Sequence, residues 1–226
     1  MSHAPHIVST RKLTSAKVDD LSVAGWKFTD HDFISKAISV PAELDARSIH
    51  NFIVLTSITG VKAFLQIVKH LNLNREDYIV YCISRGTKEY AAASKVNIKS
   101  TASTASALAD EILHDVEVKA VTYIGSNLRR EELSEKLKNA GVLVHDVIAY
   151  RTAFTPMAIT ESYEGIVFFS PSAVDSFLSS NPLKQVPCFC IGQTTADYAK
   201  QCGYKKTYIP VAPSEDILIQ TMIDYY

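Results

Sequence analysis

The chain has 226 residues, of which 47% are hydrophobic and 21% are charged, a composition typical of globular proteins and sufficient for two apolar cores. Its formal net charge is −1, and the absence of a basic block or arginine-rich stripe argues against a nucleic-acid partner. No run approaches the roughly 18 apolar residues of a membrane span, and residues 1–10 lack the apolar region of a signal peptide, so we expect a cytoplasmic protein without a membrane partner.

Short apolar runs alternate with amphipathic segments along the whole chain. The runs are rich in Val, Ile, Phe and Tyr, as buried strands are. They cover residues 7–10, 27–33, 52–56, 78–83, 121–124, 142–150, 165–170, 188–191 and 207–209. The segments between them are predicted helices, such as 128–140, where Leu133 and Leu137 lie opposite a face of Arg and Glu. This alternation predicts parallel sheets with helices on both sides.

Some glycines mark the ends of the predicted helices. Gly25, Gly141 and Gly203 each follow a helical segment and precede a strand. This is the position at which a helix commonly ends with a residue in the left-handed conformation. We therefore predict a positive φ at all three.

The sequence also repeats itself. Residues 52–65 resemble 166–178, residues 82–91 resemble 190–199, and, more weakly, residues 9–25 resemble 125–141. Each half thus holds three kinds of βα unit, which predicts two similar α/β domains. The repeat alone favours a plain tandem with a boundary near residue 120, but it is compatible with an exchanged arrangement in which the first unit belongs with the last two.

Hydroxyl side chains recur where a predicted strand ends and a helix begins. They are Ser57, Thr87, Ser126, Ser170 and Thr195. Open α/β sheets bind ligands at this edge, where helix N-termini present free N–H groups that suit carboxylates. Ser and Thr are also favoured helix caps without any ligand. Their gathering at one edge in both domains favours a ligand site.

Other common active-site patterns are missing. The sequence contains no G-x-S-x-G, no P-loop and no G-x-G-x-x-G. The four cysteines form no C-x-x-C pair, and no histidine lies at metal-ligand spacing from them. We expect Cys82, Cys188 and Cys190 to be buried free thiols and predict no metal and no redox cofactor.

Four segments, taken together, resemble the uroporphyrinogen-III synthase family. Residues 168–174 (F-F-S-P-S-A-V) are similar to its F-x-S-P-x-x-V, and residues 191–196 (I-G-Q-T-T-A) to its I-G-x-x-T-A. Residues 125–130 (G-S-N-L-R-R), with the later Y-R-T at 150–152, form the third segment, and S-T-R at 9–11 the fourth. The resemblance covers nearly the whole chain in the right order. The chain departs from it at 56–59, which lack the Pro, and at 83–87, where Ser84 replaces a Gly.

The resemblance implies an architecture. It comprises two flavodoxin-like three-layer α/β domains with parallel sheets, joined by two extended connectors near residues 38–49 and 151–163. It also implies the exchanged arrangement, with residues 1–38 and 153–226 in one domain and 39–152 in the other. We expect a monomer.

The resemblance further implies the substrate and the reaction. The family closes hydroxymethylbilane into uroporphyrinogen III without a cofactor. The enzyme must fold a flexible octacarboxylate into position and help a hydroxyl group to leave. Tyr150 is the predicted proton donor, because it matches the family's Tyr before the second connector. The predicted substrate-binding residues are Thr10, Arg11, Ser57, Thr59, Thr87, Ser126, Ser170 and Thr195.

Two alternatives of other classes remain open. One is a non-catalytic tetrapyrrole-binding or regulatory module on the same fold, favoured only by the departures near Ile58 and Ser84. The other is a solute-binding protein of two α/β lobes. The missing export signal and the short chain argue against the second alternative.

Overall fold

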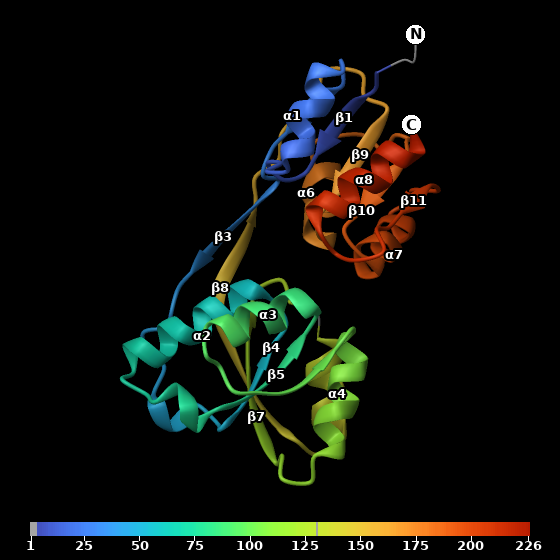
Figure 1. Ribbon diagram of the computed structural model, residues 1–226. Helices are drawn as coiled ribbons and strands as arrows, with labels where there is room; N and C mark the ends of the chain where they lie inside the picture. The colour runs from blue at the N-terminus through green and yellow to red at the C-terminus, as the bar shows by residue number, and fades with distance from the viewer. Residues whose placement is uncertain (1–3, 130) are drawn as a thin grey trace. The chain divides into compact units, whose positions relative to one another are not determined.

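A computed structural model describes residues 4–129 and 131–226 of the chain. Over these residues the chain divides into two compact units. Unit 1 comprises the residues up to Ser35 together with Ala153–Tyr226, and unit 2 comprises Lys36–Thr152. The chain passes from one unit to the other within β3 (Ile34–Ile38) and within β8 (Leu143–Phe154) (Figure 1). The first passage therefore lies upstream of the connector expected at 38–49.

The sheet of unit 1 has the order β11-β10-β9-β1-β2, and its strand pairs are parallel. Its strands are β1 (His6–Ser9), β2 (Lys27–Asp30), β9 (Gly165–Phe168), β10 (Cys188–Cys190) and β11 (Thr207–Tyr208). Its helices are α1 (Ala16–Val23), α6 (Pro171–Leu178), α7 (Gln193–Gln201) and α8 (Glu215–Tyr225). Numbered along the unit, the order is 2-1-3-4-5, which is that of flavodoxin-like folds.

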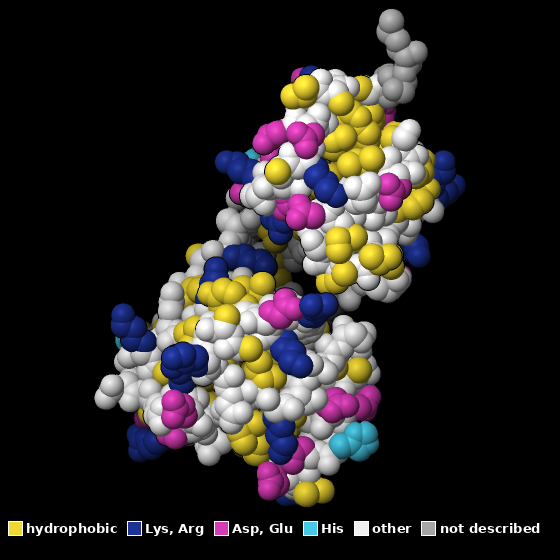
Figure 2. Space-filling model, viewed as in Figure 1, with side chains coloured by type: hydrophobic (Ala, Val, Ile, Leu, Met, Phe, Trp, Pro, Cys, Tyr) yellow, Lys and Arg dark blue, Asp and Glu magenta, His cyan; other side chains and the backbone are white. Residues whose placement is uncertain are grey.

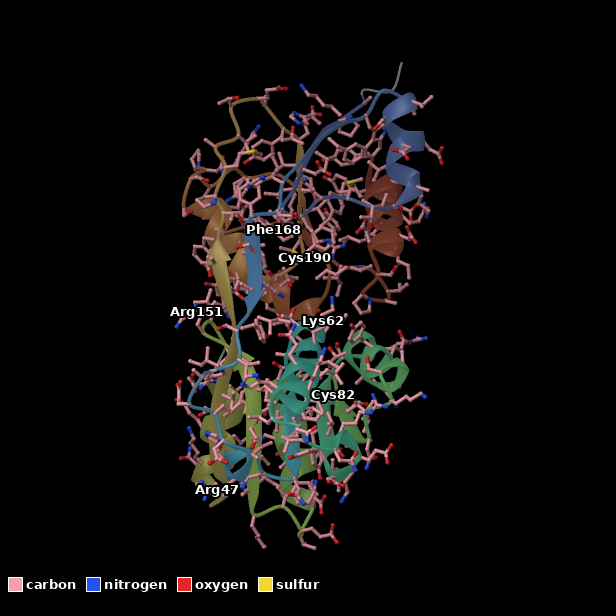
Figure 3. The ribbon with its side chains drawn as sticks, turned by 90° about the vertical axis from the view of Figure 1, so that its left-hand side faces the viewer. Arg47, Lys62, Cys82, Arg151, Phe168 and Cys190 are labelled. Carbon is pink, nitrogen blue, oxygen red and sulfur yellow. The ribbon has the colours of Figure 1, made fainter. Side chains whose placement is uncertain are left out.

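Both faces of this sheet are buried, because neighbouring residues along each strand face opposite layers. On β1, Ile7 packs with Leu218 and Met222 of α8, whereas Val8 lies in the cluster that contains residues of α6 and α7. Phe168 and Cys190 belong to this second cluster, and Figure 3 labels both inside unit 1. The predicted continuous apolar strands follow from this double burial.

The sheet of unit 2 has the order β3-β8-β7-β4-β5-β6. Its other strands are β4 (Phe52–Leu55), β5 (Ile79–Ile83), β6 (Ile98–Ala102) and β7 (Ala120–Ser126). Its helices are α2 (Ile58–His70), α3 (Arg85–Ala93), α4 (Ala105–His114) and α5 (Glu132–Asn139), with short 3-10 turns at Ala46–Ser48 and Arg75–Asp77. Helices α2 and α3 cover one face of the sheet, and α4 and α5 cover the other. The predicted α/β class is confirmed, and the sheets are mostly parallel.

The sequence repeat explains how the two sheets correspond. The repeat matches β1 with β7, β9 with β4, and β10 with β5. The run β2-β1-β9-β10-β11 of unit 1 thus corresponds to β8-β7-β4-β5-β6 of unit 2. Unit 2 is therefore a circular permutation of unit 1. The N-terminal strand pairs with β9, as the exchanged arrangement predicts, whereas a plain tandem would have placed it beside β4.

Several local details differ from the sequence-based expectation. Strands β3 and β6 were not predicted, and the helix expected from residue 128 begins at Glu132. Arg130 of the third family segment lies outside the described residues. The predicted positive φ is confirmed at Gly25 (95°), Gly141 (84°) and Gly203 (103°).

One buried tyrosine in the core of unit 1 is expected to lower stability through its hydroxyl group. Within the part of the chain that the structure describes, the Tyr204 hydroxyl is buried and has no hydrogen-bond partner. Its ring packs against Phe168, 5.5 Å between centroids. An unsatisfied buried polar group costs about 1–3 kcal/mol, so we expect Tyr204→Phe to raise the free energy of unfolding by about 1 kcal/mol in a urea titration.

The control for this variant is Tyr198→Phe in the same unit. The Tyr198 hydroxyl donates to Asp175 at 2.7 Å, so its removal should lower the free energy of unfolding. A loss of stability in Tyr204→Phe as well would mean that its hydroxyl is satisfied in solution, and the prediction would be wrong.

Candidate functional site

Each unit has candidate site residues at the carboxyl edge of its own sheet. In a doubly wound sheet, ligands bind where the strand order reverses. The switch point of unit 1 lies between β1 and β9, and the equivalent position of unit 2 lies between β7 and β4. Ser170 and Ser57 are the helix caps that follow β9 and β4.

Ser57 and Tyr150 of unit 2 are in direct contact. Ser57 caps α2, and its Oγ accepts the N–H of Gly60 at 3.0 Å. The Tyr150 hydroxyl lies 2.9 Å from the same Oγ. Tyr150 is 6% exposed. Burial raises the pKa of Tyr150 above its usual value, and the hydrogen bond from Ser57 opposes this increase.

A bulge in β8 determines where Tyr150 lies. Gly125 is paired with Ile148, but the next residue of β7, Ser126, is paired with Tyr150. Ala149 is therefore an extra residue in β8, and such bulges re-aim the side chains that follow. Ala149 and Tyr150 both pack in the cluster on the α2 side of the sheet. This places the phenol next to the α2 cap.

The end of β7 is fixed by side chains that the sequence reasoning did not single out. Asn127 pairs with the backbone of Thr152, whose N–H donates to the Asn127 Oδ1 at 2.8 Å. Arg129 lies over the Tyr123 ring, 5.6 Å from its centroid, and its Nη2 is 3.1 Å from Asp146. Gly125 leaves room for the Arg129 side chain, because a Cβ at residue 125 would lie 2.9 Å from the Arg129 Cδ. The G-S-N-L-R motif at residues 125–129 is the sequence signal that could have identified these side chains.

The other predicted residues of unit 2 lie at the same edge in different settings. Thr59 is half-buried in the first turn of α2. Thr87 is buried in the first turn of α3, and its hydroxyl is 3.1 Å from that of Ser84. The Ser126 Oγ accepts the Leu128 N–H at 3.0 Å. The hydroxyl groups of Thr87 and Ser126 therefore already have partners within the unit.

Ser84 adopts a backbone conformation that is rare for residues with a side chain. It caps α3 with φ 70° and ψ 150°. Such a conformation costs about 1–3 kcal/mol in a non-glycine residue. Replacing a serine cap by glycine costs only a few tenths of a kcal/mol. We therefore expect Ser84→Gly to raise the free energy of unfolding by about 1–2 kcal/mol, measured by denaturant titration.

Gly192, at the equivalent position of unit 1, provides the matched control. It has the extended φ of −175°, and a Cβ there would have no atom within 4 Å. Gly192→Ser should therefore change stability by less than about 0.5 kcal/mol. Equal effects of the two substitutions would contradict the strain at Ser84.

In unit 1, Thr10, Arg11 and Ser170 follow the two strands at the switch point, and Thr195 follows the next strand, β10. Ser170 caps α6, and its Oγ accepts the Ala173 N–H at 3.2 Å. Thr195 is buried in the first turn of α7. Thr10 is 1% exposed, and its hydroxyl donates to the Val167 carbonyl at 2.9 Å, which ties β1 to β9. Arg11 is half-exposed and forms an ion pair with Glu215.

Unit 2 also has a pocket of about 570 Å³ beside β8. Ser39 donates its N–H to the Ala149 carbonyl at 2.9 Å. Pro41, two residues later, has no N–H and cannot extend this backbone pairing with β8. The lining residues are Ser39, Pro41, Glu43, Leu44, Asp45, Ser48, His145, Asp146, Val147, Ile148, Tyr150 and Arg151. Tyr150 is the predicted site residue that it includes. Arg151 is exposed on β8 (Figure 3).

The cysteine side chains are as the sequence predicts. All four cysteines are free, and Cys82, Cys188 and Cys190 are buried, as predicted. Burial raises the pKa of Cys82 to about 11.

Across the described residues, no group of three or more His, Cys, Asp or Glu side chains is arranged to hold a metal ion, and no helix is long and apolar enough to cross a membrane. Figure 2 shows Lys and Arg side chains dispersed among acidic and apolar ones on the face that it presents.

The chain matches the model of a known protein family. The model of the family described as "Uroporphyrinogen-III synthase HemD" matches residues 28–220. No curated protein matches the chain.

Solved structures are similar over nearly the whole chain. The uroporphyrinogen-III synthetase of Helicobacter pylori is 19% identical, with a TM-score of 0.68 and coverage of 98% of this chain and 100% of that one. A mutant uroporphyrinogen III synthase of Thermus thermophilus is 12% identical, with a TM-score of 0.74 and 98% of both chains covered. At these identities the likeness shows a shared fold.

Proposed function

Because this chain belongs to the uroporphyrinogen-III synthase family, we propose that it closes hydroxymethylbilane into uroporphyrinogen III with inversion of ring D and without a cofactor. The observation that carries this proposal is the family match over residues 28–220. The hydroxyl groups and helix starts at the carboxyl edge of each sheet support it, because they suit a substrate with many carboxylates.

The reaction sets two tasks for the protein. Loss of water from the hydroxymethyl carbon gives an azafulvene cation, and attack by the substituted carbon of ring D gives a spiro intermediate. This intermediate breaks and recloses with ring D inverted. Without an enzyme the bilane closes to the uninverted isomer, so the protein must hold one folded conformation. It must also supply a proton to the leaving hydroxyl group.

Tyr150 is the proposed proton donor. The Ser57 Oγ already accepts the Gly60 N–H, so the Ser57 hydroxyl proton is available to the phenolic oxygen of Tyr150. In this arrangement the Tyr150 O–H remains free to donate to the leaving oxygen. The raised pKa of Tyr150 keeps the phenol in its proton-carrying form at neutral pH.

The substrate carboxylates have several proposed partners. Arg11 offers a fork that matches a carboxylate, and the helix starts at Ser57 and Ser170 offer backbone N–H groups. The complete proposed binding set is Thr10, Arg11, Ser57, Thr59, Thr87, Ser126, Ser170 and Thr195. Because several of these hydroxyl groups have partners within their unit, each is expected to contribute less than Arg11.

The organisation of the protein is also part of the proposal. We propose that residues 1–38 with 153–226, and residues 39–152, are domains that unfold separately. We further propose a cytoplasmic monomer with a small-molecule substrate and no nucleic-acid partner, in line with the net charge of −1.

The test of the function is an isomer assay. Purified protein is mixed with synthetic hydroxymethylbilane, and the oxidised products are separated by chromatography. We expect type III product to exceed type I, whereas the bilane alone should give type I. Binding of the bilane with type I product only would instead support the non-catalytic tetrapyrrole-binding module.

A further inference from the structure

Arg11 is held in one place at the carboxyl end of β1. Its guanidinium carbon lies 3.8 Å from the centroid of the Phe169 ring. Its Nη2 donates to the Oε2 of Glu215, which begins α8. The Arg11 side chain nevertheless remains 47% exposed. It is therefore fixed in orientation and open to solvent at the same time.

Glu215 is anchored independently of Arg11. Its Oε1 accepts the N–H groups of Thr14 and Ser15, at 2.5 and 2.7 Å. The neighbouring Asp216 accepts the Ser15 hydroxyl at 2.6 Å. The Glu215 side chain is only 12% exposed. The first turn of α8 thus binds the segment after β1 through contacts that do not involve Arg11.

These contacts separate two roles for Glu215. The bonds to Thr14 and Ser15 hold the backbone, so the structure of this edge does not depend on the ion pair. An ion pair whose arginine is about half exposed to solvent adds little to stability. Its main physical effect is on the freedom of Arg11, because an arginine side chain has many rotamers and ordering it opposes ligand binding.

We propose that Glu215 is a positioning residue that holds the Arg11 guanidinium beside the switch point of unit 1, ready to pair with a carboxylate of the substrate. This inference rests on the proposed function, in which Arg11 binds an octacarboxylate. The stacked Phe169 precedes the Ser170 cap, so the fixed guanidinium lies next to the end of β9. Phe169 and Glu215 together restrict the guanidinium from two sides.

The test is Glu215→Gln assayed for type III formation. The amide oxygen still accepts from the Thr14 and Ser15 N–H groups, but the charge that orients Arg11 is gone. We expect KM for hydroxymethylbilane to rise about 3- to 10-fold with kcat unchanged. Glu161→Gln is the control, because Glu161 pairs with Lys27 at the other end of the unit 1 sheet, where both side chains are more than half exposed.

A double variant shows whether the effect passes through Arg11. In an Arg11→Gln background KM is already raised, and Glu215→Gln should add nothing. An unchanged or lowered KM in Glu215→Gln, or an equal rise in both backgrounds, would overturn the proposal.

A binding measurement keeps this test separate from the proposed reaction. Fluorescence titration with uroporphyrin III, an octacarboxylate, reports affinity without turnover. If the wild type makes no type III product, the proposed function fails, and the titration still decides the role of Glu215. A 3- to 10-fold weaker affinity in Glu215→Gln that disappears in the Arg11→Gln background supports positioning, and equal affinities contradict it.

Discussion

Tyr150→Phe is expected to lower the rate of type III formation at saturating substrate about 10- to 100-fold, at or below the lower limit of the usual contribution of a general acid. The variant keeps the ring in its buried place and removes only the hydroxyl group next to Ser57. The effect stays at the lower end of the range for acid catalysis because the electron-rich pyrrole of the substrate helps to expel water. The ratio of wild-type to variant rates should stay constant between about pH 6 and 9.

The pH expectation follows from the direction of the pKa shift. Burial raises the pKa of Tyr150, so the phenol loses its proton only at a pH above the ordinary value of about 10. Across the assayed range it therefore carries the proton that it is proposed to donate.

Tyr81→Phe is the matched control for this variant. Tyr81 is a buried tyrosine of unit 2 whose hydroxyl donates to Asp115. Its loss should cost about 1 kcal/mol of stability and leave turnover unchanged. If Tyr150→Phe turns over like the wild type while remaining folded, Tyr150 is a packing residue and the catalytic assignment is wrong.

Phe177→Ala is expected to destabilise unit 1 by about 3–5 kcal/mol, the usual cost of removing a buried phenylalanine ring. Phe177 is fully buried and lies 5.4 Å from Phe33 and 5.9 Å from Phe168, measured between ring centroids. Phe33 comes from the N-terminal part of the chain and Phe168 from the C-terminal part. The substitution therefore weakens the contact that joins the two segments of unit 1.

Hydrogen exchange measures whether this loss stays in one unit. If the proposed domains unfold separately, Phe177→Ala should reduce amide protection in unit 1 and leave unit 2 unchanged. Phe64→Ala, at a fully buried ring 5.7 Å from that of Tyr78, should do the reverse. Reduced protection in both units for either variant would mean that the chain unfolds as one cooperative body.

Local sequence signals predicted much of the fold. The alternation of apolar runs and amphipathic segments, and the glycines at helix ends, depend on near neighbours along the chain. Strand β6 was missed because its centre reads Lys99, Ser100 and Thr101, and an edge strand needs fewer apolar residues. Strand β3 has a similar polar centre and lies at the other edge.

The exchanged arrangement and the site depend on distant contacts. The first βα unit has the same pattern as its counterpart in the repeat, so the repeat could not decide which set of strands it joins. The Ser57–Tyr150 contact joins residues 93 positions apart, and the bulge at Ala149 that allows it has no signature in the sequence. The Arg11–Glu215 pair spans 204 positions. Spacing along the chain contains no information about such pairs.

The pairing of β1 with β9 has a consequence for the newborn chain. Ile7 pairs with Gly165, so the first strand leaves the ribosome long before its neighbour is made. At about 5–20 residues per second this delay is roughly 8–30 seconds. Unit 2 is contiguous and is synthesised in the interval, while Ile7 and Val8, fully buried at the end, have only β2 of their sheet to pair with. The N-terminal segment is thus the part of the nascent protein that most needs protection from wrong partners.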